Sequence, residues 1–360
     1  MPQFNALTVK SIDQLTVDSV EISFIVPDEL AEHYTFEQGQ FIVLRSLING
    51  DLIERAYSIC RAPYERQLSV AIKRVDQGVF SSFATTELKE GDVIDVSEPS
   101  GSFTCSLDSS KAKQYLFIAA GSGITPIMSI LKMVLASEPE SQCVLLFGNK
   151  TATDVMFMNE LAALKIRHHK QLQIEWFFSQ VASSPQNLAD GDFLQAGRVH
   201  DGRIDQTTLE DILGKESLLL MTTLFMCGPE EMTLSLREFV LDQGVLSDNI
   251  KIELFSSSSL LSVAAEGASK SQISLLVDGE ELEVVYEDPT ESILDHALRV
   301  DPDLPYGCQN GSCGACQAKL VSGKVTMVTN YALSDSEVEE GYVLLCQAHP
   351  ESNKVVISYE

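Results

Sequence analysis

Residues 306–316 read YGCQNGSCGAC, and a further cysteine, Cys346, follows them at a distance. The stretch holds Cys308, Cys313 and Cys316, so the four thiols are spaced C-x4-C-x2-C with a remote fourth member. It also contains three glycines, which let the backbone fold tightly where residues with a Cβ atom would be strained. Such a loop leaves amide N–H groups free to point at sulfur. The pattern therefore predicts a site on which four cysteine sulfurs converge.

This spacing is the one that plant-type ferredoxins use to ligate a [2Fe–2S] cluster, so we expect the four cysteines to be its ligands. Structural zinc is the weaker alternative, because only one C-x2-C pair is present. Disulfides would need an oxidising compartment, and the chain begins without a basic, apolar export signal; we therefore expect a cytoplasmic protein. We expect Cys60, Cys105 and Cys143 to be small core residues. A cluster held by cysteines alone transfers single electrons, which predicts a redox function.

The length and charge of the chain limit the other possibilities. With 360 residues, two or three domains are expected. No apolar run approaches the roughly 18 residues that a membrane span needs, so no membrane span is expected. The net charge of −27 argues against nucleic-acid binding, because a phosphate backbone would be repelled. The acidic surface either promotes solubility or steers the protein towards a basic patch on a partner.

The pattern of the chain changes three times. Residues 1–108 show short alternating strands separated by turn residues, which predicts an antiparallel β-barrel. Residues 109–255 alternate buried strands with helices, which predicts a parallel sheet with helices on both faces. The serine-rich stretch 256–272 is typical of a flexible linker. Residues 273–360 combine two strands around Asp278–Gly279, a short helix near 293–298 and the cysteine loop, which predicts an α+β domain.

Within the first two domains the pattern predicts individual elements. The predicted strands are 20–26, 40–44, 56–60, 68–73, 115–120, 144–147, 172–178, 224–226 and 250–255, and helices are predicted from Pro126, Asp154 and Pro229.

A glycine turn lies between a buried strand and a helix, in the sequence IAAGSGITP (residues 118–126). Gly121 and Gly123 permit a tight turn and the close approach of a phosphate, and the N-terminus of the following helix favours negative charge. Pro126 suits the first turn of a helix. Many α/β proteins use glycine at this point for packing alone, but the strand–turn–helix context favours dinucleotide binding.

Two shorter motifs could add to such a site. In RAYS, residues 55–58, Tyr57 can stack on a ring while Arg55 contacts a phosphate; an ordinary edge strand with a surface arginine is the alternative. FMCGPE, residues 225–230, is a strand end that turns into a helix. Ligands bind at the carboxyl ends of strands in open α/β sheets, which places Cys227 at the rim of a nucleotide site; a buried structural thiol is the alternative.

In this order the motifs resemble the ferredoxin–NADP reductase superfamily. The matching segments are 55–58 and 71–75 for the flavin, 78–82 for its pyrophosphate, 121–126 for the pyridine nucleotide and 227–229 beside the nicotinamide. Together with a C-terminal ferredoxin, they resemble the reductases of multicomponent oxygenases. The segments 292–295, 304–306, 330–333 and 341–347 are similar in particular to the reductases of phenylacetyl-CoA epoxidase, an enzyme of phenylacetate catabolism, and of ketosteroid hydroxylases. The resemblance covers essentially the whole chain.

The resemblance implies an FAD-binding β-barrel, an NAD(P)-binding α/β domain and a β-grasp ferredoxin domain with its [2Fe–2S] cluster. Arg55 would bind the flavin phosphate, Tyr57 would stack on the isoalloxazine and Ser58 would lie near its N5. The remaining flavin residues would be Ala56, Ile72, Lys73, Val79, Phe80, Ser81 and Ser82. The nucleotide residues would be Gly121, Ser122, Gly123, Thr125, Pro126, Cys227, Gly228 and Pro229, with Thr125 and Cys227 near the nicotinamide. Glu253 and Phe255 would lie near the outer flavin face.

The implied mechanism takes a hydride from NADH or NADPH to the flavin and then single electrons to the cluster and onward to an oxygenase partner. Tyr57, Ser58 and Cys227 are the implied catalytic residues. Lys150 and Gln180 stand where many relatives have arginine, so the sequence leaves the choice between NADH and NADPH open. The linker would let the ferredoxin domain swing between the flavin and the partner. Alternatives are another redox partner, such as a hybrid-cluster protein, a desaturase or a hydroxylase, and a non-enzymatic electron carrier or redox sensor.

Overall fold

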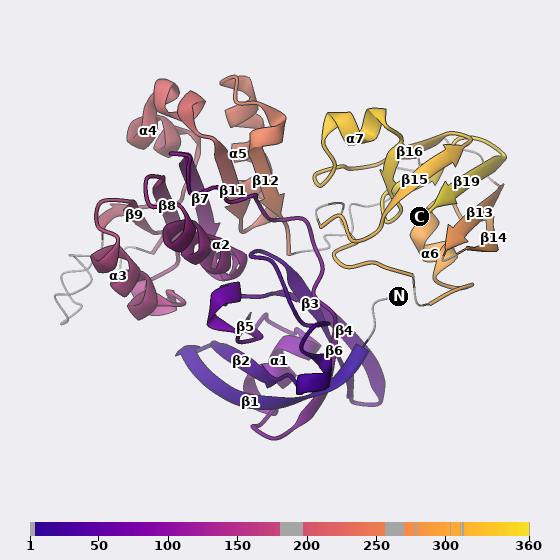
Figure 1. Ribbon diagram of the computed structural model, residues 1–360, viewed down its shortest axis with the longest axis horizontal. Helices are drawn as coiled ribbons and strands as arrows, with labels where there is room; N and C mark the ends of the chain where they lie inside the picture. The colour runs from indigo at the N-terminus through magenta and orange to yellow at the C-terminus, as the bar shows by residue number, and fades with distance from the viewer. Residues whose placement is uncertain are drawn as a thin grey trace. The chain divides into compact units, whose positions relative to one another are not determined.

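The computed structural model describes residues 4–180, 197–255 and 270–359, apart from positions 278, 303, 310 and 312. These residues divide into two compact units, one spanning Phe4–Glu253 and the other beginning at Leu254 (Figure 1). Residues 256–269 of the predicted linker lie outside the described residues, and a strand already begins at Ser271. The boundaries predicted at residues 108 and 255 remain predictions.

The first sheet of the first unit is antiparallel, in the strand order β4-β3-β6-β1-β2-β5. Its strands are β1 (Phe4–Thr16), β2 (Ser19–Ile25), β3 (Phe41–Ile48), β4 (Asp51–Ser58), β5 (Ser69–Lys73) and β6 (Val93–Ser97). Directly after β4, Ile59 pairs with Val70 of β5, so the two edge strands meet and the sheet closes. Helix α1 (Val79–Thr86) adds Phe80 and Ala84 to the barrel core. The predicted antiparallel barrel is confirmed.

The second sheet of the first unit is parallel throughout, in the order β10-β9-β8-β7-β11-β12. Its strands are β7 (Gln114–Ala120), β8 (Gln142–Asn149), β9 (Leu172–Phe178), β10 (Arg198–Asp201), β11 (Thr223–Cys227) and β12 (Ile250–Glu253). Its helices are α2 (Ile124–Ser137), α3 (Met158–Arg167), α4 (Gln206–Leu220) and α5 (Glu230–Asp242). The order reverses at β7, so right-handed crossovers place α2 and α3 on one face and α4 and α5 on the other (Figure 1). The predicted parallel sheet with helices on both faces is confirmed.

One predicted helix begins later than expected. The structure forms a 3-10 turn at Ala152–Asp154, and α3 begins only at Met158. Phe157 has a φ of 58°, a left-handed conformation that interrupts a right-handed helix. Strand β10 and helix α4 were not among the predicted elements, and α4 contains a kink at Gly214 with a φ of 68°.

The barrel has a hydrophobic core of its own, and residues of the barrel half also pack into the core of the parallel sheet. Cys60 and Ala71 of the barrel half pack in the same cluster as Ile127 and Leu131 of α2, and Phe103 meets Phe225 edge to face with ring centroids 5.2 Å apart. Burial of this continuous apolar surface stabilises the contact between the two halves. The two halves therefore belong to one compact unit.

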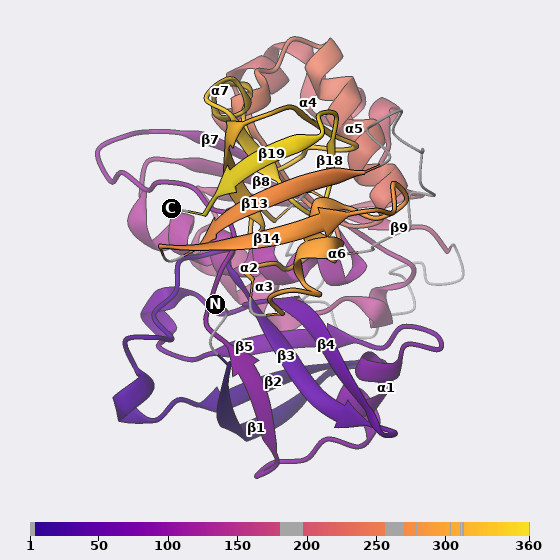
Figure 2. The same ribbon diagram turned by 90° about the vertical axis from the view of Figure 1, so that its right-hand side faces the viewer.

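The second unit contains a mixed five-stranded sheet in the order β14-β13-β19-β15-β17 and a two-stranded sheet, β16-β18. Its elements are β13 (Ser271–Val277), β14 (Glu280–Tyr286), α6 (Ile293–Ala297), β15 (Gln317–Ser322), β16 (Val325–Met327), α7 (Asp335–Glu339), β17 (Tyr342–Leu344), β18 (Ala348–Pro350) and β19 (Lys354–Ser358). Strands β13 and β14 form the hairpin predicted around Asp278–Gly279, and β13 runs parallel to β19 (Figure 2). α6 begins at the predicted position, where Ser292 and Asp295 form a capping box. This α+β fold agrees with the expected ferredoxin domain.

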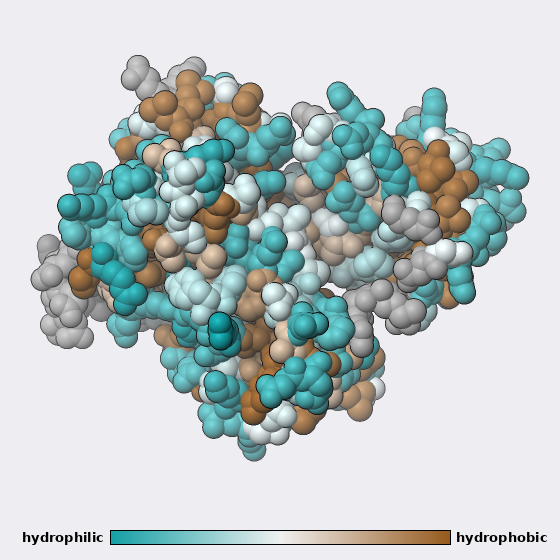
Figure 3. Space-filling view, in the orientation of Figure 1, coloured by the Kyte–Doolittle hydropathy of each residue, from teal (hydrophilic) through white to brown (hydrophobic). Residues whose placement is uncertain are grey.

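The surface is mainly hydrophilic on the face shown in Figure 3, with hydrophobic side chains gathered over α4. There Leu219 and Leu220 are 50% and 70% exposed. Among the described residues, no helix combines the length and apolar character needed to cross a membrane.

Candidate functional site: a cysteine loop and a flavin–nucleotide edge

The four predicted cluster ligands come together in the second unit as two pairs. The amides of Cys308 and Cys313 each donate to the other residue's sulfur at 3.3 Å. The amide of Cys346 donates to the sulfur of Cys316 at 3.5 Å. The side chain of Gln347 donates to the carbonyl of Gln309 at 3.0 Å and so ties the loop to the segment that carries the fourth cysteine. Residues far apart in sequence are thereby held as one sulfur-rich site.

This pairing fits a cluster of two irons better than a single ion. Within the described residues, no group of three or more histidine, cysteine, aspartate or glutamate side chains is arranged for one metal ion. A [2Fe–2S] cluster with four cysteines takes two protein sulfurs on each iron, which two cysteine pairs can supply. All eight cysteines belong to the described part of the chain and none of them forms a disulfide there, so these four sulfurs can serve a cluster.

In the first unit, the glycine turn between β7 and α2 packs against the end of β11. A Cβ atom on Gly123 would lie 2.0 Å from the carbonyl oxygen of Cys227, so only glycine lets the two segments approach this closely. A Cβ atom on Gly228 would lie 3.1 Å from the Cβ of Ala120. Gly121 differs, because it has a φ of 55° and no described atom within 4 Å of the position of a Cβ. The turn therefore has a packed side at Gly123 and an open side at Gly121.

The open side fits the phosphates of a dinucleotide. The Ile124 amide of α2 already donates to carbonyls of the 3-10 turn Gly121–Gly123, but no described side chain caps the start of that turn, so its first N–H groups are available to an anion. Thr125, although predicted beside the nicotinamide, donates its hydroxyl to the carbonyl of Ser122 at 3.0 Å and stabilises the turn. Pro126 is buried within the first turn of the helix.

Asn149, at the carboxyl end of β8, is a residue that sequence reasoning missed. Ala120 pairs with Gly148, so Asn149 lies level with Gly121 at the sheet edge. Its side chain shares a face with that of Phe147, which packs in the core beneath α2. Asn149 is 8% exposed, and within the described parts of the chain neither its side-chain oxygen nor its nitrogen has a hydrogen-bond partner. A buried amide without partners costs free energy, which points to a ligand that both donates and accepts.

The predicted flavin residues lie on the barrel half. Tyr57 packs against Phe80 of α1 with ring centroids 5.7 Å apart, and burial raises the pKa of its phenol well above the ordinary value. Arg55 is exposed, and its guanidinium donates to the carbonyl of Glu54 at 2.6 Å. No side chain among the described residues caps the N-terminus of α1, where Val79 is 46% exposed. An aromatic face, an exposed arginine and open helix amides together fit a flavin with its pyrophosphate.

A buried hydrogen bond joins the flavin edge of the barrel to the parallel sheet. The hydroxyl of Ser58 donates to the carboxylate of Glu253 at 2.7 Å, and both residues are at most 5% exposed. Cys227 pairs with Glu253 across β11 and β12. Burial, followed by the charge of Glu253, raises the pKa of the Cys227 thiol well above its ordinary value, so this thiol stays neutral. Three residues that the resemblance implies for the flavin and nicotinamide sites are thus brought together.

The other predicted residues occupy varied positions. Ile72 is buried in the barrel core, while Lys73 pairs with Asp18 at 3.5 Å. Phe255 is 46% exposed and belongs to the second unit, so its position at the flavin face remains a prediction. Among the rest, Ala56 and Pro229 are exposed, Ser82 and Ser122 are half-buried, and Ser81 is buried. Lys150 and Gln180, the two departures from the family pattern, are exposed beside one another, with the Gln180 amide donating to the Lys150 carbonyl at 3.0 Å.

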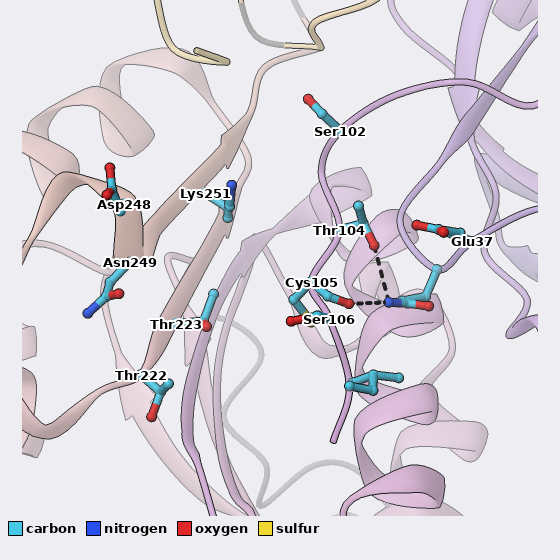
Figure 4. A pocket seen from close by; sticks show the side chains of 12 residues that line it. Glu37, Ser102, Thr104, Cys105, Ser106, Thr222, Thr223, Asp248, Asn249 and Lys251 are labelled. Atoms are coloured by element: carbon cyan, nitrogen blue, oxygen red, sulfur yellow. Dashed lines mark hydrogen bonds between the residues drawn. The ribbon is translucent and has the colours of Figure 1, made fainter. Parts of the chain in front are cut away.

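A cavity of about 660 Å³ lies at the opposite, amino end of β11 and β12 (Figure 4). Thr223, Lys251 and the segment around Cys105 line it. Coenzymes bind at the carboxyl ends of such strands, so this cavity is separate from the dinucleotide edge. Cys105, expected in the core, is half-buried: it packs against the core cluster and also lines the cavity, and burial raises the pKa of its thiol to about 11. Cys60 and Cys143 are core residues as expected.

Comparison with known proteins covers all three parts of the chain. Residues 6–105 match the oxidoreductase FAD-binding domain, residues 117–238 the oxidoreductase NAD-binding domain, and residues 275–351 the 2Fe-2S iron-sulfur cluster binding domain. These matches show FAD, NAD(P)H and a [2Fe–2S] cluster as the cofactors.

Full-length relatives share the same three parts. A component of 1,2-phenylacetyl-CoA epoxidase from Escherichia coli (strain K12) is 36% identical over 100% of this chain and 99% of its own length. The ferredoxin reductase component of 3-ketosteroid-9-alpha-monooxygenase from Rhodococcus rhodochrous is 28% identical over 98% of this chain and 96% of its own. The structure of phthalate dioxygenase reductase is similar in fold, with a TM-score of 0.56 and 21% identity over 99% of this chain and 98% of that one. The chain therefore belongs to the family of oxidoreductases that join FAD-binding and NAD-binding domains to a C-terminal [2Fe–2S] ferredoxin domain, the NAD(P)H-dependent reductase components of multicomponent oxygenases.

Proposed function

We propose that the chain supplies electrons to an oxygenase resembling phenylacetyl-CoA epoxidase. The observation that carries this proposal is the full-length identity to the epoxidase component, which is higher than the identity to the steroid monooxygenase reductase. The cysteines in the described part of the chain form no disulfide, which agrees with a reducing compartment, so we propose a cytoplasmic location. The electron-acceptor protein would then be the oxygenase component of the same system.

The flavin residues would act by binding and orientation. When bound, the flavin accepts a hydride from NAD(P)H and delivers electrons singly to the cluster. Tyr57 would cover the ring, Arg55 would bind a phosphate bidentately, and the open first turn of α1 would bind the pyrophosphate. The Ser58 hydroxyl would stand beside the ring, oriented by the carboxylate of Glu253 at 2.7 Å. Since this hydroxyl donates to a buried acceptor, its direction is fixed before any coenzyme arrives.

The coenzyme residues would lie along one edge of the parallel sheet. The turn at Gly121 and the first amides of α2 would bind the coenzyme's phosphates, and the orphaned amide of Asn149 would bind a hydroxyl or amide group of the coenzyme. The Cys227 thiol, neutral because burial raises its pKa, would contribute shape beside the nicotinamide and no charge. The paired cysteines of the second unit would hold the cluster.

Reconstitution with purified partners tests this proposal. The holoprotein is mixed with the oxygenase component of a phenylacetyl-CoA epoxidase, and NADH or NADPH oxidation is followed with and without phenylacetyl-CoA. We expect substrate-dependent coenzyme oxidation with formation of the epoxide, and none with the oxygenase of a ketosteroid monooxygenase. A Cys346→Ser variant is the control: it should lose this coupling yet still reduce ferricyanide from the flavin, because it lacks one cluster ligand. Efficient coupling to the steroid oxygenase instead would assign a different partner.

A further inference from the structure

Five charged side chains meet where the barrel half of the first unit contacts the nucleotide-binding half. Glu21 of β2, together with Arg61 and Glu65 of the β4–β5 connection, comes from the barrel, while Lys132 comes from α2 and Glu160 from α3. We call this group the Arg61–Lys132 cluster. None of its members was singled out by a sequence motif.

Arg61 forms the barrel side of the cluster and also reaches across the contact. Its guanidinium donates two hydrogen bonds to the carboxylate of Glu21, from Nε to Oε1 at 2.5 Å and from Nη2 to Oε2 at 2.6 Å. Its remaining nitrogen, Nη1, lies 3.3 Å from Glu65 and 3.3 Å from Glu160. This bidentate geometry fixes the plane of the guanidinium. One cation therefore binds carboxylates of both halves.

Lys132 crosses the contact in the opposite direction. Its ammonium group lies 3.0 and 3.2 Å from the two carboxylate oxygens of Glu65, and it also pairs with Glu160. The Lys132 side chain is only 3% exposed. Because Arg61 and Lys132 each bind Glu65 and Glu160, displacement of one half along the other would break several charge-assisted bonds at once.

A buried ionic cluster is a poor source of net stability, since desolvation of the charges offsets much of their attraction. Glu21 is 2% exposed and Lys132 is 3% exposed, so both carry this penalty almost fully. The adjoining apolar core already holds the two halves together. Directional hydrogen bonds favour a single position of one half relative to the other, which we call the register, whereas an apolar contact alone allows the halves to slide.

The register that the cluster sets is that of α2, the helix that follows the glycine turn. Thr125, Ser129 and Lys132 are spaced i, i+4 and i+7 and so lie on one face of this helix. The hydroxyl of Ser129 donates to the carbonyl of Arg61 at 2.7 Å. Lys132 is therefore about 10 Å along the helix from Thr125 in its first turn, and Arg61 follows Ser58 by three residues.

We propose that Arg61 and Lys132 are positioning residues for hydride transfer, which hold the coenzyme turn of α2 in register with the flavin edge of the barrel. This inference rests on the proposed flavin and coenzyme sites. Hydride transfer requires the donor and acceptor carbon and nitrogen atoms in near contact, and a misplacement of about 1 Å can cost up to 100-fold in rate. The cluster acts on that distance through the backbone, without touching either reactant.

The test is a Lys132→Met variant of the holoprotein, which keeps the length of the side chain and removes its charge. In anaerobic stopped-flow experiments we expect the limiting rate of flavin reduction by NADH or NADPH to fall by about tenfold or more. Electron transfer from flavin to cluster, started by photoreduction without coenzyme, should keep its wild-type rate. Independently of activity, hydrogen exchange should become faster at the backbone amides of α2 and of residues 61–65.

Three further variants make the result specific. Lys132→Arg retains a cation and should restore most of the rate. Lys113→Met removes a comparable lysine, whose ammonium lies 2.7 Å from the buried Glu138 and donates to the carbonyl of Ser106 at 2.8 Å. It should leave flavin reduction unchanged, because Glu138 follows the last turn of α2, at the end remote from the glycine turn. Ser129→Ala deletes a single bond to Arg61 and should slow flavin reduction by a few fold without loss of folding, which keeps the test available if Lys132→Met does not fold.

Several outcomes would overturn the inference. Wild-type flavin reduction and wild-type exchange in Lys132→Met, or an equal loss of rate in Lys113→Met, would show that the cluster has no positioning role. Equal slowing of flavin-to-cluster transfer would show general damage. If the wild-type holoprotein itself is not reduced by either coenzyme, the proposed function fails, while the exchange measurement still decides whether the cluster fixes α2.

Discussion

Two glycines in one short turn have different reasons to be glycine. Gly123 has a helical φ, but a Cβ there would lie 2.0 Å from the backbone oxygen of Cys227. Gly121 has open space on its side of the turn but a φ of 55°. We expect Gly123→Ala to lower the free energy of unfolding by roughly 3 kcal/mol, because backbone must move, and Gly121→Ala by only about 1 kcal/mol. Urea unfolding of both variants checks the order, and equal losses would contradict it.

We predict that Asn149 lowers the stability of the protein without coenzyme and contributes to coenzyme binding. Replacing it with leucine removes two buried polar atoms that lack partners among the described residues, so Asn149→Leu should raise the free energy of unfolding without coenzyme by about 1 kcal/mol. The same change should reduce the rise in melting temperature that NADH or NADPH produces, because a binding group is lost. Thermal unfolding with and without coenzyme measures both effects.

The control for Asn149 is an asparagine whose amide is satisfied. The side chain of Asn330 donates to the carbonyl of Leu333 at 3.0 Å and accepts from its amide at 2.9 Å. Asn330→Leu should therefore destabilise the protein, opposite in sign to Asn149→Leu. A loss of stability in both variants would show that Asn149 has a structural bond that water supplies.

At the scale of elements, local signals predicted local structure. The strand predicted at 172–178 is β9, Leu172–Phe178, and the strand pair predicted around Asp278–Gly279 is present, since β13 ends at Val277 and β14 begins at Glu280. The predicted start of helix α3 at Asp154 was wrong, because the sequence gives no sign of the left-handed conformation of Phe157. The site contacts depend on tertiary packing: Ser58 and Glu253 are 195 positions apart, and no periodicity connects Arg61 with Lys132. Motifs could therefore indicate which residues matter, but the structure was needed to show which of them meet.

Strand β18 contains a titratable group in a buried setting. Nδ1 of His349 is 2.8 Å from the Tyr286 hydroxyl, and burial lowers the pKa of His349 below its usual 6.5. The folded state therefore holds this ring neutral, whereas the unfolded state takes up a proton near pH 6.5. The contribution of this group to stability is complete above that pH and is lost as the pH falls towards the folded pKa.

We therefore expect the melting temperature of the ferredoxin unit to fall between pH 7.5 and about 5.5. His349→Asn keeps an acceptor for Tyr286 at a similar position but does not titrate, so it should flatten this dependence. Circular dichroism of the holoprotein at each pH measures the transition. An unchanged slope in the variant would assign the pH dependence to other groups.

At the scale of the whole molecule, the acidic charge decides which acceptors approach readily. The net charge is −27, and much of the face shown in Figure 3 is hydrophilic. An acidic surface attracts a basic electron acceptor and repels an anionic one, and salt weakens both effects. The dependence of the reduction rate on ionic strength should therefore show whether an acceptor is attracted or repelled by this surface, independently of the chemistry of the flavin and the cluster.

We therefore predict that rising ionic strength changes the reduction rates of a basic and an anionic acceptor in opposite directions. When ionic strength rises from about 0.01 to 0.15 M, the Debye length shrinks from about 30 to 8 Å. The second-order rate constant for reduction of cytochrome c, a basic protein, should then fall, because its attraction to the acidic surface is screened. The rate constant for ferricyanide, a trianion, should rise, because its repulsion is screened, and an uncharged quinone should show little change. If cytochrome c and ferricyanide responded with the same sign, the surface that delivers electrons would carry a local charge unlike that of the molecule as a whole.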